Sequence, residues 1–221
     1  MASTDIASID LSSELKAFQA NFIKDIPDEI VNVFMSKTEE LAKSGLVESA
    51  VKVGDKAPAF TLPDSKGDPV VLEDLLKKGP VVVTFYRGVW CPYCNIAVNA
   101  LQAALPEFEA KGATLVAITP ELPQYIDQMT TAKKLTFPVL SDLGLKVGKQ
   151  YGLSFVLDPQ LQKLYTEFGL DVNKHNDDKT FQLPLPATYV IAQDGTVKYA
   201  FVDADYSKRA EPADILKALE M

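Results

Sequence analysis

The sequence predicts an α/β domain with a central mixed β-sheet flanked by helices, preceded by a helical extension over residues 1–50. Short, uniformly apolar and β-branched runs at 80–86 and 114–119 are typical of strands buried on both faces. Segments with apolar residues at helical spacing lie between such runs. This alternation indicates a largely parallel sheet centre, and 221 residues suffice for one sizeable domain with an appendage.

Composition and charge exclude several classes of function. A net charge of −8 argues against binding to nucleic acid or to an anionic membrane surface. No apolar run reaches the length of a transmembrane helix, and residues 1–6 lack the basic patch and apolar core of a secretory signal. We therefore expect a cytoplasmic protein with no nucleic-acid partner, no membrane partner, no metal and no cofactor.

The first 50 residues show two amphipathic stripes. Apolar residues recur every three or four positions from Leu11 to Ile26, and a second segment is lined by Ile30, Val31, Phe34, Leu41 and Leu46. Each stripe predicts a helix, and Gly45 marks the end of the second. Packing of both helices on the domain is the favoured interpretation, and a homodimer interface is the alternative. The predicted domain boundary lies between residues 50 and 51.

Turn residues and apolar runs divide the middle of the chain into alternating elements. Gly and Pro punctuate an extended segment from residue 53, and the stretch 66–69 predicts the turn of a hairpin. The predicted elements that follow are a short helix at 73–78, a strand at 80–86, a helix at about 91–110, a strand at 114–119, a helix at 122–134, a short strand and turn at 137–142, and a helix at 145–151.

Residues 153–182 interrupt this alternation and predict an insertion. Residues 155–168 have helical spacing, whereas 173–179 are polar and predict a loop. His175 in that loop is expected to be a solvated residue rather than a ligand. A strand at 183–192, a hairpin turn at 194–195, a return strand at 196–202 and a helix at 211–221 complete the prediction.

Both cysteines lie in one motif, Cys91-Pro92-Tyr93-Cys94, where a buried strand passes into a helix. Free N–H groups and the dipole at a helix N-terminus favour a thiolate, so Cys91 is expected to have the lower pKa. Cys94 follows on the same helical face, within reach of a disulfide. A redox pair, an inert core pair and half of a zinc site are the alternatives, and the strand–CxxC–helix context favours the first.

Four segments, in order, resemble the peroxiredoxin-like group (alkyl hydroperoxide reductase and thiol-specific antioxidant family) of the thioredoxin superfamily. They are Gly54–Phe60, the strand Val83–Tyr86 followed by Cys91, the segment from Ser141 to Gly152, and Pro186–Ile191 with Asp194-Gly195. The resemblance extends from about Val53 to the C-terminus. It implies a thioredoxin-like, peroxiredoxin-type fold for residues 51–221, and the helical extension before it is expected to lie apart from the redox site.

Three positions depart from the family pattern. Family members usually carry a proline after the tyrosine of the strand, and a threonine or serine three residues before the reactive cysteine. Arg87 and Gly88 occupy these positions here. Pro186 replaces the arginine that usually opens the late strand, and a proline there resembles thioredoxins, whose cis-proline faces the cysteine pair. The Cys91–Cys94 motif itself resembles that of glutaredoxins.

The resemblance implies thiol-dependent reduction of hydrogen peroxide or organic hydroperoxides. Cys91 would attack the peroxide and become a sulfenic acid, and Cys94 would resolve it as a disulfide. A thioredoxin-, glutaredoxin- or glutathione-type reductant would restore the dithiol. The alternative is a thioredoxin- or glutaredoxin-like thiol–disulfide oxidoreductase that uses the same pair. A non-catalytic binding protein of the same fold is a third interpretation, disfavoured by the intact motif.

Several neighbours of the motif are candidate supporting residues. Arg87 is either a cation that lowers the thiol pKa and replaces the family arginine, or a surface charge. Tyr86 and Tyr93 are candidate hydroxyl donors, and Trp90 is expected to cover the thiol with apolar surface. Because family donors for the departing oxygen are missing, we expect slower peroxide reduction than in a standard family member.

Overall fold

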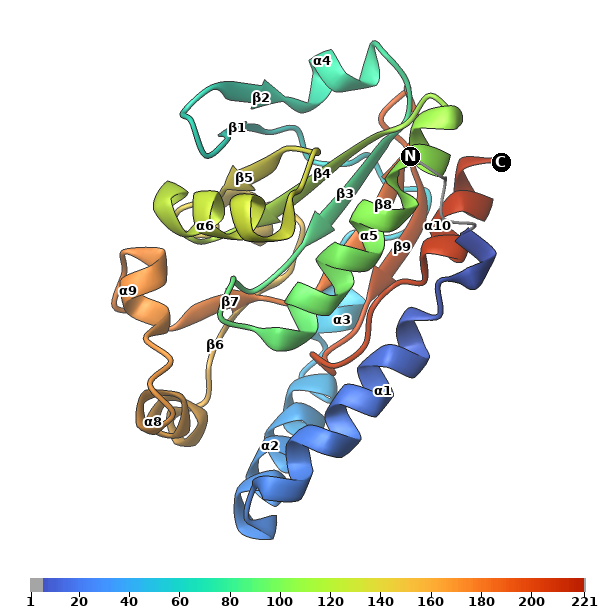
Figure 1. Ribbon diagram of the computed structural model, residues 1–221. Helices are drawn as coiled ribbons and strands as arrows, with labels where there is room; N and C mark the ends of the chain where they lie inside the picture. Colours follow the sequence, from blue (N-terminus) through green and yellow to red (C-terminus); the bar gives the residue numbers. More distant parts are fainter. Residues whose placement is uncertain (1–5, 221) are drawn as a thin grey trace.

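A five-stranded mixed sheet forms the centre of the computed structural model, which describes residues 6–220 (Figure 1). Its strand order is β5-β4-β3-β8-β9. The β3–β4 and β4–β5 pairs are parallel, whereas β3–β8 and β8–β9 are antiparallel, so the predicted mixed sheet is confirmed. The strands are β3 (Val81–Phe85), β4 (Thr114–Thr119), β5 (Val139–Ser141), β8 (Ala187–Ile191) and β9 (Val197–Val202).

The central strand is buried on both faces, as its uniform apolar sequence predicts. Side chains alternate across a sheet, so Val82 faces one core cluster, while Val81, Val83 and Phe85 face the other. All five residues of β3 are buried. This strand, fixed between two packed layers, leads directly into the cysteine motif.

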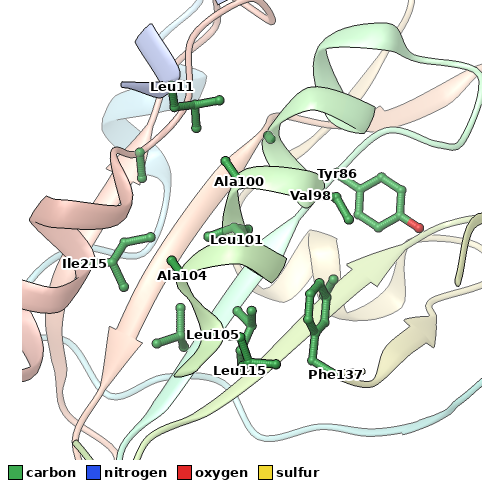
Figure 2. Close-up of a cluster of buried hydrophobic side chains, with 14 of the residues drawn as sticks. Leu11, Tyr86, Val98, Ala100, Leu101, Ala104, Leu105, Leu115, Phe137 and Ile215 are labelled. Atoms are coloured by element: carbon green, nitrogen blue, oxygen red, sulfur yellow. The ribbon is translucent and has the colours of Figure 1, made fainter. Parts of the chain in front are cut away.

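Four helices cover the first face of the sheet. Figure 2 shows Leu101 and Leu105 of α5 near Leu115 of β4, with Ile215 of α10 close by. Leu11 of α1 is 1% exposed and belongs to this cluster, so the first N-terminal helix is part of the main core. These helices are α1 (Leu11–Phe22), α5 (Pro92–Ala110), α6 (Pro123–Lys133) and α10 (Pro212–Leu219).

The opposite face is covered by two short helices and closed at one end by a hairpin. Leu72 and Leu76 of α4, with Val147 of α7, pack against the second face of the sheet. An isolated bridge between Asp64 and Leu140 joins the hairpin region to β5. The elements are β1 (Thr61–Pro63), β2 (Pro69–Val71), α4 (Leu72–Leu76) and α7 (Lys146–Gln150).

The N-terminal segment is helical, as predicted. Asp10 caps α1 by accepting from the backbone N–H of Ser13 at 2.9 Å. The carboxylate of Glu211, which precedes α10, accepts from the N–H groups of Leu11 and Ser12 and so joins α1 to α10. The remaining N-terminal helices are η1 (Ile6–Ser8), η2 (Ile23–Asp25), α2 (Asp28–Ala42) and α3 (Leu46–Ser49).

The predicted helix over 155–168 and loop over 173–179 are wrong in part. Residues Ser154–Val156 form strand β6, antiparallel to β7 (Gln182–Pro184), and only Pro159–Glu167 form helix α8. The polar stretch contains helix α9 (Val172–Asn176), which Asp171 caps through the N–H of Lys174. A three-residue strand is too short to show periodicity. The insertion buries its own core against Phe34 and Val33 of α2.

One further property concerns membranes. Within residues 6–220, no helix has both the length and the apolar character needed to cross a bilayer.

Candidate active site

The cysteines lie where β3 passes into α5, as the sequence predicts. Cys91 is the N-cap residue of α5, and Pro92 occupies the first helical turn, where its missing N–H costs nothing. The N–H of Cys91 donates to the carbonyl of Gly88 at 3.1 Å. A Cβ at Gly88 would clash with the indole nitrogen of Trp90 and would lie 2.9 Å from Oε1 of Glu121, so only glycine fits this turn.

Both thiols are free and buried. Cys91 is 2% exposed and Cys94 is 0% exposed, and the two thiols are close enough for each to shift the pKa of the other. The predicted pairing of the two cysteines on one face of the helix is therefore present. Such a buried pair shares its protons, so the surrounding charges decide which sulfur carries the negative charge.

Those charges favour Cys94 rather than Cys91. Nη2 of Arg209 lies 3.0 Å from Sγ of Cys94, and the backbone N–H and positive charge of Arg87 also favour a charged Cys94. Burial opposes the thiolate, but the Cys91 hydrogen bond and Arg209 together hold the pKa of Cys94 well below its usual value. Burial and the bond to Cys94 raise the pKa of Cys91. These directions run against the expected order, in which Cys91 has the lower pKa, and the assignment of Cys91 as the nucleophile stays a prediction.

The physical reason is that a helix terminus carries only about half an elementary charge. A guanidinium in direct contact with the sulfur carries a full one, in a site from which water is excluded. Arg209 is held in place because its Nη1 donates to the carbonyls of Tyr206 and Lys208, at 2.6 and 2.7 Å.

Arg209 is the functional residue that sequence reasoning missed. It lies 115 positions from Cys94, in the segment before α10, and no local motif connects the two. One signal was available: the chain has 22 lysines and arginines, of which only Arg87 and Arg209 are arginines. Both arginines lie near the cysteine pair. A planar guanidinium offers several donors in a fixed arrangement, whereas the ammonium of lysine is a flexible point charge.

Arg87 is buried, so the alternative of a surface charge is wrong. It is 3% exposed, and its Nη2 donates to the hydroxyl of Tyr165 at 2.5 Å. Its guanidinium lies 5.0 to 5.6 Å from the centroids of the Trp90, Tyr165 and Tyr206 rings, within cation–π range. Across residues 6–220, no acidic side chain is within ion-pair distance of Arg87 or Arg209, so neither guanidinium is neutralised by a carboxylate.

The predicted aromatic neighbours form a layer around Arg87 and the motif. Trp90 packs edge-on against Tyr165, and Tyr93 against Tyr206, with centroids 5.7 and 5.5 Å apart. Burial raises the pKa of Tyr93 to about 12, and burial with the charge of Glu121 holds the pKa of Tyr86 well above its usual value. Both phenols stay protonated at neutral pH, as hydrogen-bond donors must.

Pro186 and Arg87 line the same small cavity. The register opposes Phe85 to Ala187, which brings Pro186 next to the end of β3. Pro186, Arg87 and Tyr206 line a cavity of about 30 Å³, and neither cysteine is among its lining residues. Every peptide bond among the described residues is trans, so the expected likeness to the thioredoxin cis-proline does not hold.

A buried carboxylate anchors the loop before Cys91. Glu121 is 0% exposed, and its Oε2 accepts from the N–H of Val89 at 2.8 Å. Its Oε1 lies 2.7 Å from Nδ1 of His175, whose ring stacks on Tyr125 with centroids 3.8 Å apart. His175 is therefore not a solvated loop residue, because it ties the insertion to the cysteine loop. Within the described part of the chain, no cluster of three His, Cys, Asp or Glu side chains could hold a metal.

The N-terminal helices contact the same aromatic layer. Phe18 of α1 packs edge-on against Tyr93, and Phe34 of α2 lies 6.1 and 6.4 Å from the ring centroids of Tyr165 and Tyr206. The extension thus reaches the surroundings of the site, against the expectation that it lies apart from it. The domain boundary at residue 50 stays a prediction.

A thioredoxin-like sheet with a buried dithiol at the start of a helix defines the class of thiol-based oxidoreductases. The sequence profile of the AhpC/TSA family matches residues 53–200. A relative from Mycobacterium tuberculosis, assigned to the peroxiredoxins by name, is 33% identical over 157 residues, covering 71% of this chain and 86% of the relative. Peroxiredoxin Bcp of Escherichia coli is 31% identical over 103 residues, covering 47% of this chain and 65% of that protein.

Solved structures agree in fold. Peroxidoxin BcpB of Mycobacterium tuberculosis superposes with a TM-score of 0.61 at 24% identity, covering 77% of this chain and 97% of that one. Peroxiredoxin Q of Xanthomonas campestris superposes with a TM-score of 0.57 at 18% identity, covering 73% and 89%. The chain belongs to the AhpC/TSA family of peroxiredoxins. It is accordingly a thiol-dependent peroxidase, an oxidoreductase.

Proposed function

We propose that the protein reduces hydrogen peroxide or small organic hydroperoxides through Cys91, and that Cys94 completes the reaction as the resolving thiol. One observation carries this proposal: two free, buried thiols lie in one helical turn, Arg209 contacts one of them, Arg87 is buried in the adjoining loop, and no carboxylate of residues 6–220 is ion-paired to either guanidinium. Cys91 is the attacking sulfur because it precedes the helix and is the less deeply buried of the two, 2% exposed against 0% for Cys94.

The chemistry balances without a cofactor. The Cys91 thiolate attacks one peroxide oxygen, the O–O bond breaks, and the other oxygen leaves as alkoxide or hydroxide and takes a proton. Cys94 then attacks the sulfur of the Cys91 sulfenic acid, and water leaves as the disulfide forms. A dithiol donor of thioredoxin, glutaredoxin or glutathione type returns two electrons by exchange through a mixed disulfide.

Arg87 supports departure of the peroxide oxygen. Its Nε has no hydrogen-bond partner among the described residues, although the side chain is 3% exposed, so this donor is free for an oxygen that develops negative charge. Trp90, Tyr93 and Tyr206 exclude water around the site. The donors expected in other family members are replaced here, and Arg87 takes their role.

Burial favours a peroxide over a protein disulfide as the oxidant. Neither cysteine is more than 2% exposed, and a hydrogen peroxide molecule is about the size of two waters, whereas a protein disulfide must bring its own chain to the sulfur. Reduction of the product disulfide then requires its exposure to the donor. The cycle also needs a compartment that keeps thiols reduced, which favours the cytoplasm.

The test compares two substrates on one preparation. Reduced wild-type protein should consume hydrogen peroxide and cumene hydroperoxide with dithiothreitol as donor, and should reduce insulin disulfides much more slowly. Cys91→Ser should abolish peroxide consumption. Cys94→Ser should still react once and then accumulate over-oxidised Cys91 or a dimer linked through Cys91. Brisk insulin reduction without peroxide consumption would instead establish the protein as a thiol–disulfide oxidoreductase.

A further inference from the structure

Three segments meet at the edge of the sheet from which the cysteine motif begins. β3, β4 and β5 are parallel, so their carboxyl ends lie at this same edge. The turn before Cys91 follows β3, and Glu121 lies two residues beyond the end of β4. Oγ of Ser141, the last residue of β5, donates to the main-chain carbonyl of Glu121 at 2.6 Å. Glu121 is therefore fixed in position by β4 and β5.

The turn Gly88–Cys91 is closed by local hydrogen bonds and by one bond to Glu121. The N–H of Cys91 donates to the carbonyl of Gly88 at 3.1 Å. Nδ2 of Asn95 in α5 donates to the carbonyl of Val89 at 2.8 Å. The N–H of Val89 donates to Oε2 of Glu121, also at 2.8 Å. Neighbours in sequence shape this turn, and Glu121 ties it to the segment that follows β4.

The second oxygen of Glu121 is held by the insertion. Oε1 lies 2.7 Å from Nδ1 of His175 in α9, whose side chain is 18% exposed. The main-chain carbonyl of His175 accepts from the N–H of Leu122 at 2.8 Å, and its ring stacks on Tyr125. Both the main chain and the side chain of His175 thus hold α9 against the start of α6, and the two helices lie close together in Figure 1.

The two contacts of the Glu121 carboxyl group depend on each other. Glu121 is 0% exposed, and a buried carboxyl group lowers stability unless its oxygens are hydrogen-bonded. One oxygen is bonded to the turn before Cys91 and the other to the insertion. Loss of either partner would leave a buried oxygen unpaired, so a displacement of α9 would also weaken the hold on the turn.

We propose that Glu121 and His175 are positioning residues for Cys91, and that the insertion, residues 153–182, acts through them to hold the turn from which Cys91 attacks a hydroperoxide. This inference rests on the proposed function and deepens it. Neither side chain has to touch the peroxide, because a displacement of about 1 Å at the reacting atoms is enough to slow a reaction about a hundredfold.

Two substitutions of His175 separate the effect of its nitrogen from that of its ring. His175→Asn keeps a polar nitrogen near the position of Nδ1 and loses the stacked ring. His175→Phe keeps a ring against Tyr125 and loses the contact with Glu121. Oxidation of the reduced full-length chain by hydrogen peroxide, followed by stopped flow, should be at least about tenfold slower in His175→Phe and within about threefold of wild type in His175→Asn.

Substitutions of Glu121 test the other half of the contact. Glu121→Leu has neither oxygen and should lose at least as much rate as His175→Phe. Glu121→Gln keeps an oxygen for the N–H of Val89 and a polar atom for His175, so it should recover part of the loss. Thermal melting shows whether each variant is folded, and the two His175 variants decide the question if Glu121→Leu does not fold.

Trp90 reports on the turn itself, because it is the single tryptophan of the chain. Acrylamide should quench its fluorescence in the reduced protein more strongly in His175→Phe than in the wild type or in His175→Asn, because the turn is then less firmly held. Lys174→Asn, at the exposed neighbouring position of α9, is the matched control and should change neither the quenching nor the peroxide rate.

Several results would overturn the proposal. They are a wild-type peroxide rate in His175→Phe, unchanged Trp90 quenching in a slow His175→Phe, or a slower reaction in His175→Asn than in His175→Phe, which would assign the effect to the stacked ring. A wild type that ignores peroxide would refute the proposed function instead. In that case, stronger quenching in His175→Phe than in His175→Asn would still support the hold of the insertion on the turn, and equal quenching would refute it.

Discussion

Two regions meet at the cysteines, and they are built in different ways. The strand–loop–helix region, residues 81–110, positions both thiols with neighbours in sequence: β3, the Gly88 turn and the start of α5. The cover, which we define as α1–α2, α8–α9 and residues 203–210, supplies side chains from far along the chain, such as Arg209 and Tyr165. The positions of the thiols are local in sequence, whereas the groups that set their charge are not.

The first prediction removes the buried cation of the strand–loop–helix region. Arg87→Leu should slow peroxide reduction about a hundredfold or more, the usual effect of losing a donor to the departing oxygen. Stopped-flow peroxide reduction measures this, with Arg87→Lys as the comparison, because it keeps the charge and loses the planar fork. A rate for Arg87→Leu within about threefold of wild type would show that the cover alone supports the reaction.

The second prediction loosens the cover. Phe34→Ala removes the ring of α2 that lies against Tyr165 and Tyr206, and it should lower the free energy of unfolding by about 1–2 kcal/mol, because this side chain is half-buried. It should also speed alkylation of the thiols by iodoacetamide. Met35→Ala, at an adjacent residue that is 66% exposed, should change the free energy of unfolding by less than about 0.5 kcal/mol. Equal effects of the two variants would mean that α2 does not stabilise the cover.

The third prediction concerns the pH dependence of the loop anchor. Burial raises the pKa of the Glu121 carboxyl, so the folded protein binds this proton more tightly than the unfolded chain does. The resulting stability is full below the unfolded pKa of about 4.3 and is lost as pH rises through the raised folded value. Between the unfolded pKa and the raised folded pKa, the free energy of unfolding of the wild type should fall relative to that of Glu121→Gln. The fall should be about 1.4 kcal/mol for every tenfold difference in proton affinity between the folded and unfolded states.

Urea denaturation at a series of pH values measures that difference. Glu109→Gln, at an exposed position of α5, serves as the control and should run parallel to the wild type. A wild-type curve that also runs parallel to Glu121→Gln would show that the buried carboxyl does not titrate with folding, and that the Val89 and His175 contacts hold it charged throughout.

Sequence patterns predicted correctly those elements whose formation depends on residues close together in the chain. The strand at 114–119 was predicted residue for residue, and β3 to within one residue at each end, because uniformly apolar β-branched runs have few alternatives to a buried strand. The strand β6 and the helix α9 were missed, because each is held by partners distant in the chain or by a single cap. A window of neighbouring residues does not contain β7, the partner of β6, and one capping Asp before a five-residue polar stretch does not by itself predict a helix.

The candidate site shows the same difference between residues that are close in sequence and residues that only the fold brings together. The CxxC at a strand–helix junction identified both thiols, but the helix terminus alone did not reveal the guanidinium of Arg209 beside Cys94. Arg209 and Glu121 reach the site only through the fold, and the engagement of His175 with Glu121 follows from the packing of the insertion. The rarity of arginine in a lysine-rich chain was the one sequence feature that pointed toward Arg209.

The most direct test of the mechanism is to locate the oxidised sulfur. Reduced Cys94→Ser would be mixed with an equimolar amount of hydrogen peroxide in the presence of dimedone, which captures sulfenic acids, and its peptides analysed by mass spectrometry. We predict the dimedone adduct on the peptide that contains Cys91, and a Cys91–Cys94 disulfide within a monomer when the wild type is oxidised without dimedone. An adduct on Cys94 in the Cys91→Ser protein, formed at the wild-type rate while Cys91 stays unmodified in Cys94→Ser, would contradict the mechanism.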